Sequence, residues 1–126
     1  MLPRARRVVK AAFPVILKQG AVWHSPVLSL RVWSPPNIGI GKQKTIFQAK
    51  FSVIVSGKVS TKAVERNLWK RRSRAIISKF KDKIKNNYYC LLYLKPTIKT
   101  LSFKQLSDNI KDIFYRANLF INNLQS

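Results

Sequence analysis

Hydrophobic and polar positions along the chain fall into six blocks, and each block has the period of one kind of secondary structure. Apolar residues spaced three or four positions apart predict helices, whereas alternating or short continuous apolar runs predict strands. In chain order we predict a helix at 10–20, strands at 26–33 and 45–56, a helix at 58–80, a strand at 88–94 and a helix at 103–120. This order, α-β-β-α-β-α, predicts an α+β fold in which helices pack on a small sheet.

Residues with known capping preferences stand at the predicted ends of the helices. Gly20 suits the position just after the first helix. Ser60 or Thr61 can cap the start of the helix that runs to about residue 80. Ser102 and Gln105 have the spacing of a capping box, in which each side chain bonds the backbone N–H of the other residue.

The predicted strands have features that indicate their neighbours in the sheet. Residues 26–33 and 45–56 should pair as an antiparallel hairpin across residues 34–44, a loop rich in proline and glycine whose length predicts mobility. Residues 88–94 are apolar enough to form a central strand. The strand–helix–strand unit from 45 to 94 would by default make a right-handed crossover.

The helix at 58–80 carries a stripe of basic side chains along one face. At about 100° per residue the stripe consists of Lys62, Arg66, Lys70 and Arg74, with Asn67 and Arg71 beside it. Like charges four residues apart repel by roughly 0.2–0.5 kcal/mol per pair, so the stripe indicates that an array of anions neutralises it. We expect Val64, Leu68 and Ala75 on the opposite, buried face, with Ile76 at its edge.

The composition of the chain makes a nucleic-acid phosphate backbone the best candidate for that array of anions. The 126 residues include 25 Lys and Arg but only 4 Asp and Glu, which gives a net charge of +21. A solvated helix face normally mixes both signs, whereas Glu65 is the only acidic residue in this helix. A clustered basic face of this kind is the electrostatic footprint of a nucleic-acid-binding protein.

The length and hydropathy of the chain favour one domain outside the membrane. We expect residues 1–126 to form a single RNA-binding domain, with residues 1–9 as a basic arm that carries Arg4, Arg6 and Arg7. Hydrophobic residues make up 46% of the chain, enough for a modest core. No apolar run approaches the ~20 residues of a spanning helix, and the start of the chain lacks the apolar core of a signal peptide, so we expect a cytoplasmic protein.

Residue types that carry out catalysis in protein enzymes are scarce. Cys90 is the only cysteine and His24 the only histidine, which excludes an internal disulfide and a thiolate metal cluster. The sequence has no Walker loop and no Gly-x-Ser-x-Gly motif. Four scattered acidic residues do not support acid–base or two-metal chemistry by the protein alone. If the protein acts within an enzyme, another component should carry out the reaction.

The apolar side chains of the first predicted helix allow two interpretations. Phe13, Ile16 and Leu17 share one face, and the pattern alone favours their burial in the core. The alternative is a partly open apolar floor on which an unpaired base could stack.

The run from Phe51 to Arg74 is similar to the signature of the bacterial ribonuclease P protein subunit family. The family pattern is an FxxxVSKKV-like strand end followed by KAVxRNxxKRRxR on a helix. The matching positions here are Phe51, Val55-Ser56, Lys58-Val59, Lys62-Ala63-Val64, Arg66-Asn67, Lys70-Arg71-Arg72 and Arg74. The resemblance extends over nearly the whole chain, through Met1-Leu2-Pro3, the segment from Phe13 to Gly20, Lys95-Pro96 and the LSFKQL start of the last helix.

This resemblance implies a subunit of an RNA enzyme. In the family, a catalytic RNA subunit uses Mg²⁺ to cleave precursor tRNA at its mature 5′ end, and the protein binds this ribonuclease P RNA and the single-stranded 5′ leader. By position, the residues that would contact the catalytic RNA are Lys58, Lys62, Arg66, Asn67, Lys70, Arg71 and Arg74. Phe13 and Leu17 would line the leader cleft, which favours the open apolar floor. The resemblance also implies a left-handed crossover, Mg²⁺ bound mainly by the RNA, and no catalytic or metal-binding residue on the protein.

The chain departs from the family pattern at several positions. Leu68 stands where a second arginine commonly follows the Arg-Asn pair, and Leu17 stands where a second cleft phenylalanine is common. Gly57 replaces the first lysine of a pair, and Ser60-Thr61 replaces a glycine.

Two other classes of function share some of these features. A ribosomal or general RNA-binding structural protein would have similar charge and size, and it is the main alternative. A DNA-binding module should offer base-reading side chains beyond arginine and lysine, and Asn67 alone is thin support, so no DNA partner is expected.

Overall fold

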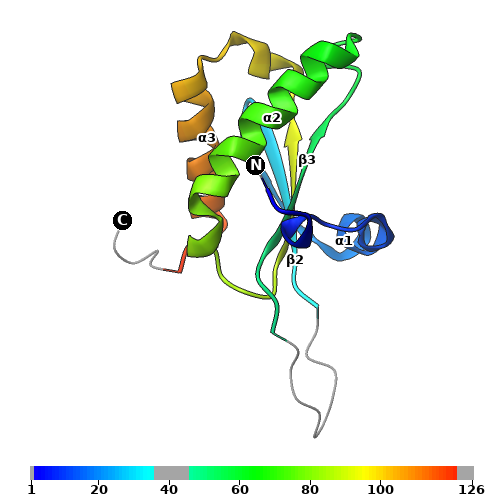
Figure 1. The fold of residues 1–126 in the computed structure, drawn as a ribbon, viewed down its shortest axis with the longest axis vertical. Helices are drawn as coiled ribbons and strands as arrows, with labels where there is room; N and C mark the ends of the chain where they lie inside the picture. Colours follow the sequence, from blue (N-terminus) through cyan, green and yellow to red (C-terminus); the bar gives the residue numbers. More distant parts are fainter. Residues whose placement is uncertain (1, 36–45, 122–126) are drawn as a thin grey trace, which may run out of the picture.

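The computed structural model describes residues 2–35 and 46–121, in which helices pack on both faces of a four-stranded sheet (Figure 1). The helices are α1 (Phe13–Gln19), α2 (Ala63–Phe80) and α3 (Phe103–Arg116), and the strands are β1 (Ala21–His24), β2 (Leu28–Trp33), β3 (Lys50–Val55) and β4 (Tyr89–Leu94). Short 3₁₀ helices are η1 (Arg4–Arg6), η2 (Lys10–Ala12), η3 (Lys81–Lys83) and η4 (Pro96–Thr100). The α+β class predicted from the sequence is confirmed.

The strands follow the order β1-β2-β4-β3 across the sheet, so the predicted hairpin between 26–33 and 45–56 is wrong. β4 lies between β2 and β3, antiparallel to the first and parallel to the second. The cause is burial: β4 has apolar side chains on both faces, with Leu91 and Leu92 almost fully buried, so it gains most from the central position. The prediction of a central strand at 88–94 is confirmed. Most of the predicted loop at 34–44 lies outside the described residues.

The described part of the chain has one strand more than the predicted order α-β-β-α-β-α, namely β1. β1 pairs with β2 as an antiparallel hairpin, and Ser25 Oγ in the turn accepts a hydrogen bond from the Leu28 N–H at 2.9 Å. With four residues β1 is too short to show an alternating pattern in the sequence. β3, α2 and β4 form the expected parallel crossover unit, and its hand stays a prediction.

The two faces of the sheet differ in what covers them. α2 packs on β3 and α3 packs on β1 and β2, all on one face, which we call the core face. The strand residues buried there are Leu28, Leu30, Val32, Phe51, Val53, Val55, Cys90, Leu92 and Leu94. Burial of each larger side chain contributes about 1.5–3 kcal/mol. α1 lies on the other face, which we call the α1 face, where Ile16 is fully buried but Arg31 and Tyr93 are only half-buried (Figure 1).

The buried side of α2 differs from the predicted one. Its buried residues are Trp69, Ser73, Ile76, Ile77 and Phe80, whereas Val64 is 80% exposed and Leu68 and Ala75 are half-buried. Trp69, Ile76 and Phe80 follow at spacings of seven and four and bury more apolar surface than the smaller set, so they decide the orientation. The basic stripe therefore borders the buried side of α2 instead of lying opposite to it.

The predicted helix ends are confirmed at the start of α3, at the end of α1, where Gly20 is the C-cap, and at the end of α2, but the start of α2 differs. The capping box is confirmed: the Gln105 N–H donates to Ser102 Oγ at 3.2 Å, and the Ser102 N–H donates to Gln105 Oε1 at 2.9 Å. α3 ends at Arg116 because Asn118 turns the chain with φ 59°, a conformation that asparagine tolerates. α2 begins at Ala63, and its N-cap is Lys62, so the predicted cap by Ser60 or Thr61 is wrong.

The N-terminal segment lies along the outer edge of β3 and is not an open basic arm. Arg6 is only 5% exposed and holds this segment in place. Its Nε donates to the Ala49 carbonyl at 2.8 Å, its Nη1 to Asp82 Oδ1 at 2.8 Å and its Nη2 to the Lys81 carbonyl at 3.0 Å. Leu2 is buried as well. Arg6 is thus a structural anchor, whereas Arg4 and Arg7 of the same segment are exposed.

Candidate nucleic-acid interface

The predicted RNA-binding residues lie on α2 and on the turn before it. Lys58, Lys62, Asn67 and Arg71 are exposed, whereas Arg66, Lys70 and Arg74 are half-buried along the border of the buried side. We call these seven residues the α2 basic surface. The structure brings them together on one helix and its preceding turn, and their contact with RNA stays a prediction.

Arg66 has a structural contact in addition to its place in the α2 basic surface. Its Nη1 donates to the Ser60 carbonyl at 2.9 Å, which ties the turn before α2 to the first turn of the helix. Arg72, by contrast, lies outside the α2 basic surface, and its Cζ is 5.2 Å from the ring centre of the buried Trp69. Basic residues of α2 thus divide into some that serve packing and others that project into solvent.

The α2 basic surface has no compensating acid within the described residues. Among the described residues, ion pairs join Arg6 and Lys81 to Asp82, Lys99 to Glu65, and Arg116 to Asp112. None of the seven residues of the surface takes part in these pairs. Burial lowers the pKa of Arg74, and the nearby positive charge of Arg7 lowers it further. The surface is therefore a concentration of positive charge that suits a polyanion.

The two predicted cleft residues lie at different depths on α1. Phe13 is half-buried and Leu17 is 45% exposed, while Ile16 between them is fully buried. Ile16 therefore attaches α1 to the sheet, and the interpretation of all three residues as core is wrong for Leu17. Exposed apolar groups beside basic side chains can accept unpaired bases without sequence preference.

Arg31 lies next to Leu17, and Tyr93 lies next to Arg31; neither was among the predicted site residues. Arg31 Nη1 donates to the Leu17 carbonyl at 3.3 Å, and its Cζ is 6.0 Å from the ring centre of Tyr93. Burial raises the pKa of Tyr93, and the charge of Arg31 opposes this rise. The signal was available in the alternation of β2, which places Arg31 on the face opposite to the buried Leu30.

Aromatic side chains gather at the end of the same face where β2 ends and β4 begins. The ring centres of Trp33 and Tyr89 are 5.6 Å apart, and those of Phe47 and Tyr89 are 5.1 Å apart. Lys50 Nζ is 5.9 Å from the ring centre of Phe47. The α1 face thus combines rings and cations, which is the composition of a surface for single-stranded nucleic acid.

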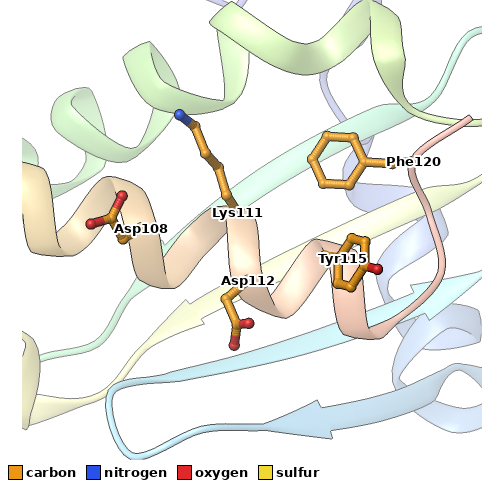
Figure 2. A pocket seen from close by; sticks show the side chains of 5 residues that line it. All are labelled: Asp108, Lys111, Asp112, Tyr115 and Phe120. Atoms are coloured by element: carbon orange, nitrogen blue, oxygen red, sulfur yellow. The ribbon is translucent and has the colours of Figure 1, made fainter. Parts of the chain in front are cut away.

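The outer side of α3 has a different character. An open hollow of about 400 Å³ is lined by Asp108, Lys111, Asp112, Tyr115 and Phe120 (Figure 2). Asp108 and Asp112 are two of the four acidic residues of the chain. The hollow therefore does not suit a polyanion, and the basic surfaces lie elsewhere.

Two features that the described residues lack bear on the class of site. Nowhere in residues 2–35 and 46–121 do three His, Cys, Asp or Glu side chains gather in a way that could hold a metal ion. No helix in this part of the chain has both the length and the apolar character needed to cross a membrane.

Comparisons with known proteins agree on one family. The family model described as Ribonuclease P matches residues 2–118. The ribonuclease P protein component of Synechococcus elongatus is 28% identical over 120 residues, which cover 94% of each chain, and that of Phytoplasma australiense is 37% identical over 82 residues, or 65% of this chain and 70% of the relative. The structure resembles the RNase P protein of Staphylococcus aureus with a TM-score of 0.78 at 20% identity, covering 93% of this chain and 99% of that one. It resembles the Thermotoga maritima protein with a TM-score of 0.72 at 17% identity, covering 87% and 96%.

Proposed function

The chain belongs to the ribonuclease P protein family, and on this basis we propose that it is the protein subunit of an RNA-based ribonuclease P. In this proposal it binds the catalytic RNA and the single-stranded 5′ leader of precursor tRNA. The complex then removes the leader by Mg²⁺-dependent endonucleolytic cleavage and leaves the mature tRNA 5′ end. The proposed location is the cytoplasm, where its substrate would be made.

The α2 basic surface is the observation that carries the proposal for the catalytic RNA. The family signature KAVxRNxxKRRxR falls on the helix whose basic residues lack an acidic partner within the described residues. Binding to phosphates releases counterions and removes the repulsion between these side chains. A large folded RNA offers the array of phosphates that such a surface needs.

The apolar and basic side chains on and beside α1 support the proposal for the leader. Leu17 is exposed and Phe13 half-buried, and the guanidinium of Arg31 lies beside Leu17. Unpaired bases can pack on these apolar groups while the phosphates contact cations. Because none of these contacts reads a base edge, the cleft should accept leaders of many sequences.

The chemistry of cleavage belongs to the RNA in this proposal. Mg²⁺ bound to the RNA would activate the water that attacks the phosphodiester. In this proposal the RNA supplies the magnesium ligands and the protein supplies none. The protein would act by binding and by orienting the substrate.

Reconstitution tests the proposed function. The purified protein is mixed with the ribonuclease P RNA of its own source at low Mg²⁺, and 5′ cleavage of a precursor tRNA is followed. We expect strong cleavage that requires the protein and none from the protein alone. A folded protein that gives no stimulation would overturn the proposal and favour a ribosomal or general RNA-binding structural protein.

A further inference from the structure

Arg7 lies at the outer edge of β3 and is exposed, although Arg6 beside it is buried. The backbone of Arg7 forms a parallel bridge with Phe51, and the Val8 N–H donates to the Phe51 carbonyl at 3.2 Å. Arg7 Nε donates to the Leu2 carbonyl at 3.1 Å. These contacts fix the guanidinium at the edge, and no other described residue is shown to bond its two terminal nitrogens, which can contact a further partner.

Arg74 projects from α2 toward the same edge. Glu65 of α2 forms an ion pair with Lys99 of η4 at 3.3 Å. The side of α2 that carries Glu65 therefore faces η4. Arg74 is nine residues further along, about two and a half turns, and therefore lies on the opposite side of the helix. Because α2 packs on β3 while α3 packs on β1 and β2, the side of α2 away from η4 and α3 overlooks the outer edge of β3 (Figure 1).

Because Arg7 lies at the edge of β3 that Arg74 overlooks, their like charges act on each other. The positive charge of Arg7 and the burial of Arg74 both lower the pKa of Arg74. Neither arginine has an acidic partner within the described residues. Two like charges that the fold holds together in partly desolvated surroundings cost free energy unless an anion lies between them.

We propose that Arg7 and Arg74 jointly bind one backbone phosphate of an RNA strand that crosses the outer edge of β3. Two arginine forks offer several N–H donors in fixed geometry, which suits the oxygens of a single phosphate. The β3 edge lies between the α2 basic surface and the α1 face of the sheet, so the site connects the two surfaces. This inference rests on the proposed function, and the phosphate belongs either to the catalytic RNA or to the 5′ leader.

A double-mutant cycle in the full-length protein tests the shared phosphate. Arg7→Gln, Arg74→Gln and the double variant are compared for affinity to the ribonuclease P RNA, and then, as holoenzymes, for affinity to precursor tRNA and to mature tRNA. We expect each single change to weaken binding about tenfold and the double change to weaken it by little more than that, because either loss breaks the same site. The slope of log K against log salt should fall by about one in the double variant, whereas two separate phosphates would lower it by about two.

Control variants separate this role from a structural one and from general loss of charge. Lys104→Gln with Lys111→Gln removes the same charge from the exposed side of α3 and should change affinity much less. Arg7→Lys keeps the charge, so its slope of log K against log salt should equal that of the wild type. The melting temperature of free Arg74→Gln should stay level or rise, because a repulsion is removed.

The RNA for which the variants lose affinity identifies the source of the phosphate. A loss with the catalytic RNA alone assigns the phosphate to that RNA, and a loss only with precursor tRNA assigns it to the leader. Two results would overturn the shared site while the proposed function stands, provided that the wild-type protein binds ribonuclease P RNA. In the first, the variants bind ribonuclease P RNA and precursor tRNA as tightly as the wild type does. In the second, the affinity losses of the two single variants add fully in the double variant. Failure of the wild-type protein to bind that RNA would instead overturn the proposed function.

Discussion

The Arg6 side chain is buried next to exposed arginines on either side of it in the sequence. It makes hydrogen bonds to two carbonyl oxygens and to Asp82, and it joins the N-terminal segment to β3 and to the end of α2. Hydrogen bonds to a charged group typically contribute about 1.5–3 kcal/mol each, so this one residue is a substantial part of the tertiary structure. Composition alone assigns all three arginines to one arm, because charge does not report burial.

At the same scale, Asp82 should make stability depend on pH. The hydrogen bond from Arg6 holds the pKa of Asp82 below its usual value of 3.8. Because the folded state has the lower pKa, the stabilising effect is present above about pH 4 and disappears as the pH falls through the lowered value. We expect Asp82→Asn to lower the melting temperature at pH 7. Near pH 2 the melting temperatures of the variant and the wild type should be nearly equal. Asp108→Asn is the matched control, and an equal decrease at both pH values in Asp82→Asn would contradict this account.

The exposure of the α1 side chains leads to a prediction about substrate. Phe13→Ala removes an apolar surface that would pack against the leader, and Phe13 is only half-buried, so the fold should survive. We expect the holoenzyme to lose affinity for precursor tRNA by about tenfold and to keep its affinity for mature tRNA. Ile16→Val, a change at the buried neighbour, serves as the control for altered packing of α1. Equal losses for both RNAs would argue against the cleft.

At the scale of elements, α2 shows how far a sequence pattern determines a fold. The existence of the helix and its basic stripe follow from spacing alone, but its rotation about its own axis does not. Val64, Leu68 and Ala75 formed an apolar set by angle, yet the larger Trp69 and Ile76 are the residues that the core buries. Apolar area, not the number of apolar positions, decides which side packs.

Strand pairing was less accessible to sequence reasoning for a related reason. A hairpin is the default for neighbouring strands, but here β4 displaces that pairing because both of its faces bury apolar groups, as Leu91 and Leu92 show. On the α1 face, by contrast, the alternation of side chains along a strand does predict which residues lie there. Arg31 follows from the period of two along β2, whereas Arg7 at the β3 edge depends on a contact between segments more than forty residues apart, which local patterns do not contain.

Half-buried Lys70 and exposed Arg71 of the α2 basic surface should contribute strongly to affinity for the catalytic RNA. Lys70→Gln with Arg71→Gln removes two charges but leaves Arg66 in its hydrogen bond to the Ser60 carbonyl. We expect the slope of log K against log salt to fall by about two and the melting temperature to change little. The α3 pair Lys104→Gln with Lys111→Gln removes equal charge and should leave the slope nearly unchanged. An unchanged slope in the folded α2 variant would mean that this surface does not contact the RNA.

At the scale of the whole molecule, charge is distributed unevenly over the fold. The basic groups that lack an acidic partner among the described residues include those of α2 and the β3 edge, while Asp108 and Asp112 lie on the outer side of α3 (Figure 2). We expect this uneven distribution to help orient an approaching RNA before contact. The acidic hollow on α3 would then face away from the RNA.

The net charge of +21 predicts opposite effects of salt on folding and on binding. In the free protein the like charges repel, and KCl at 0.3 M screens this repulsion over a distance shorter than about 10 Å. Relief of about 1 kcal/mol would raise the melting temperature by roughly 4 °C between 0.02 and 0.3 M KCl. Affinity for RNA should fall over the same range, because counterion release becomes less favourable.

Thermal unfolding by circular dichroism and filter binding measure the two effects in the same buffers. The variant Lys70→Gln with Arg71→Gln should show a smaller rise in melting temperature. A wild-type melting temperature that falls with KCl would show that repulsion between like charges does not limit the stability of the free protein.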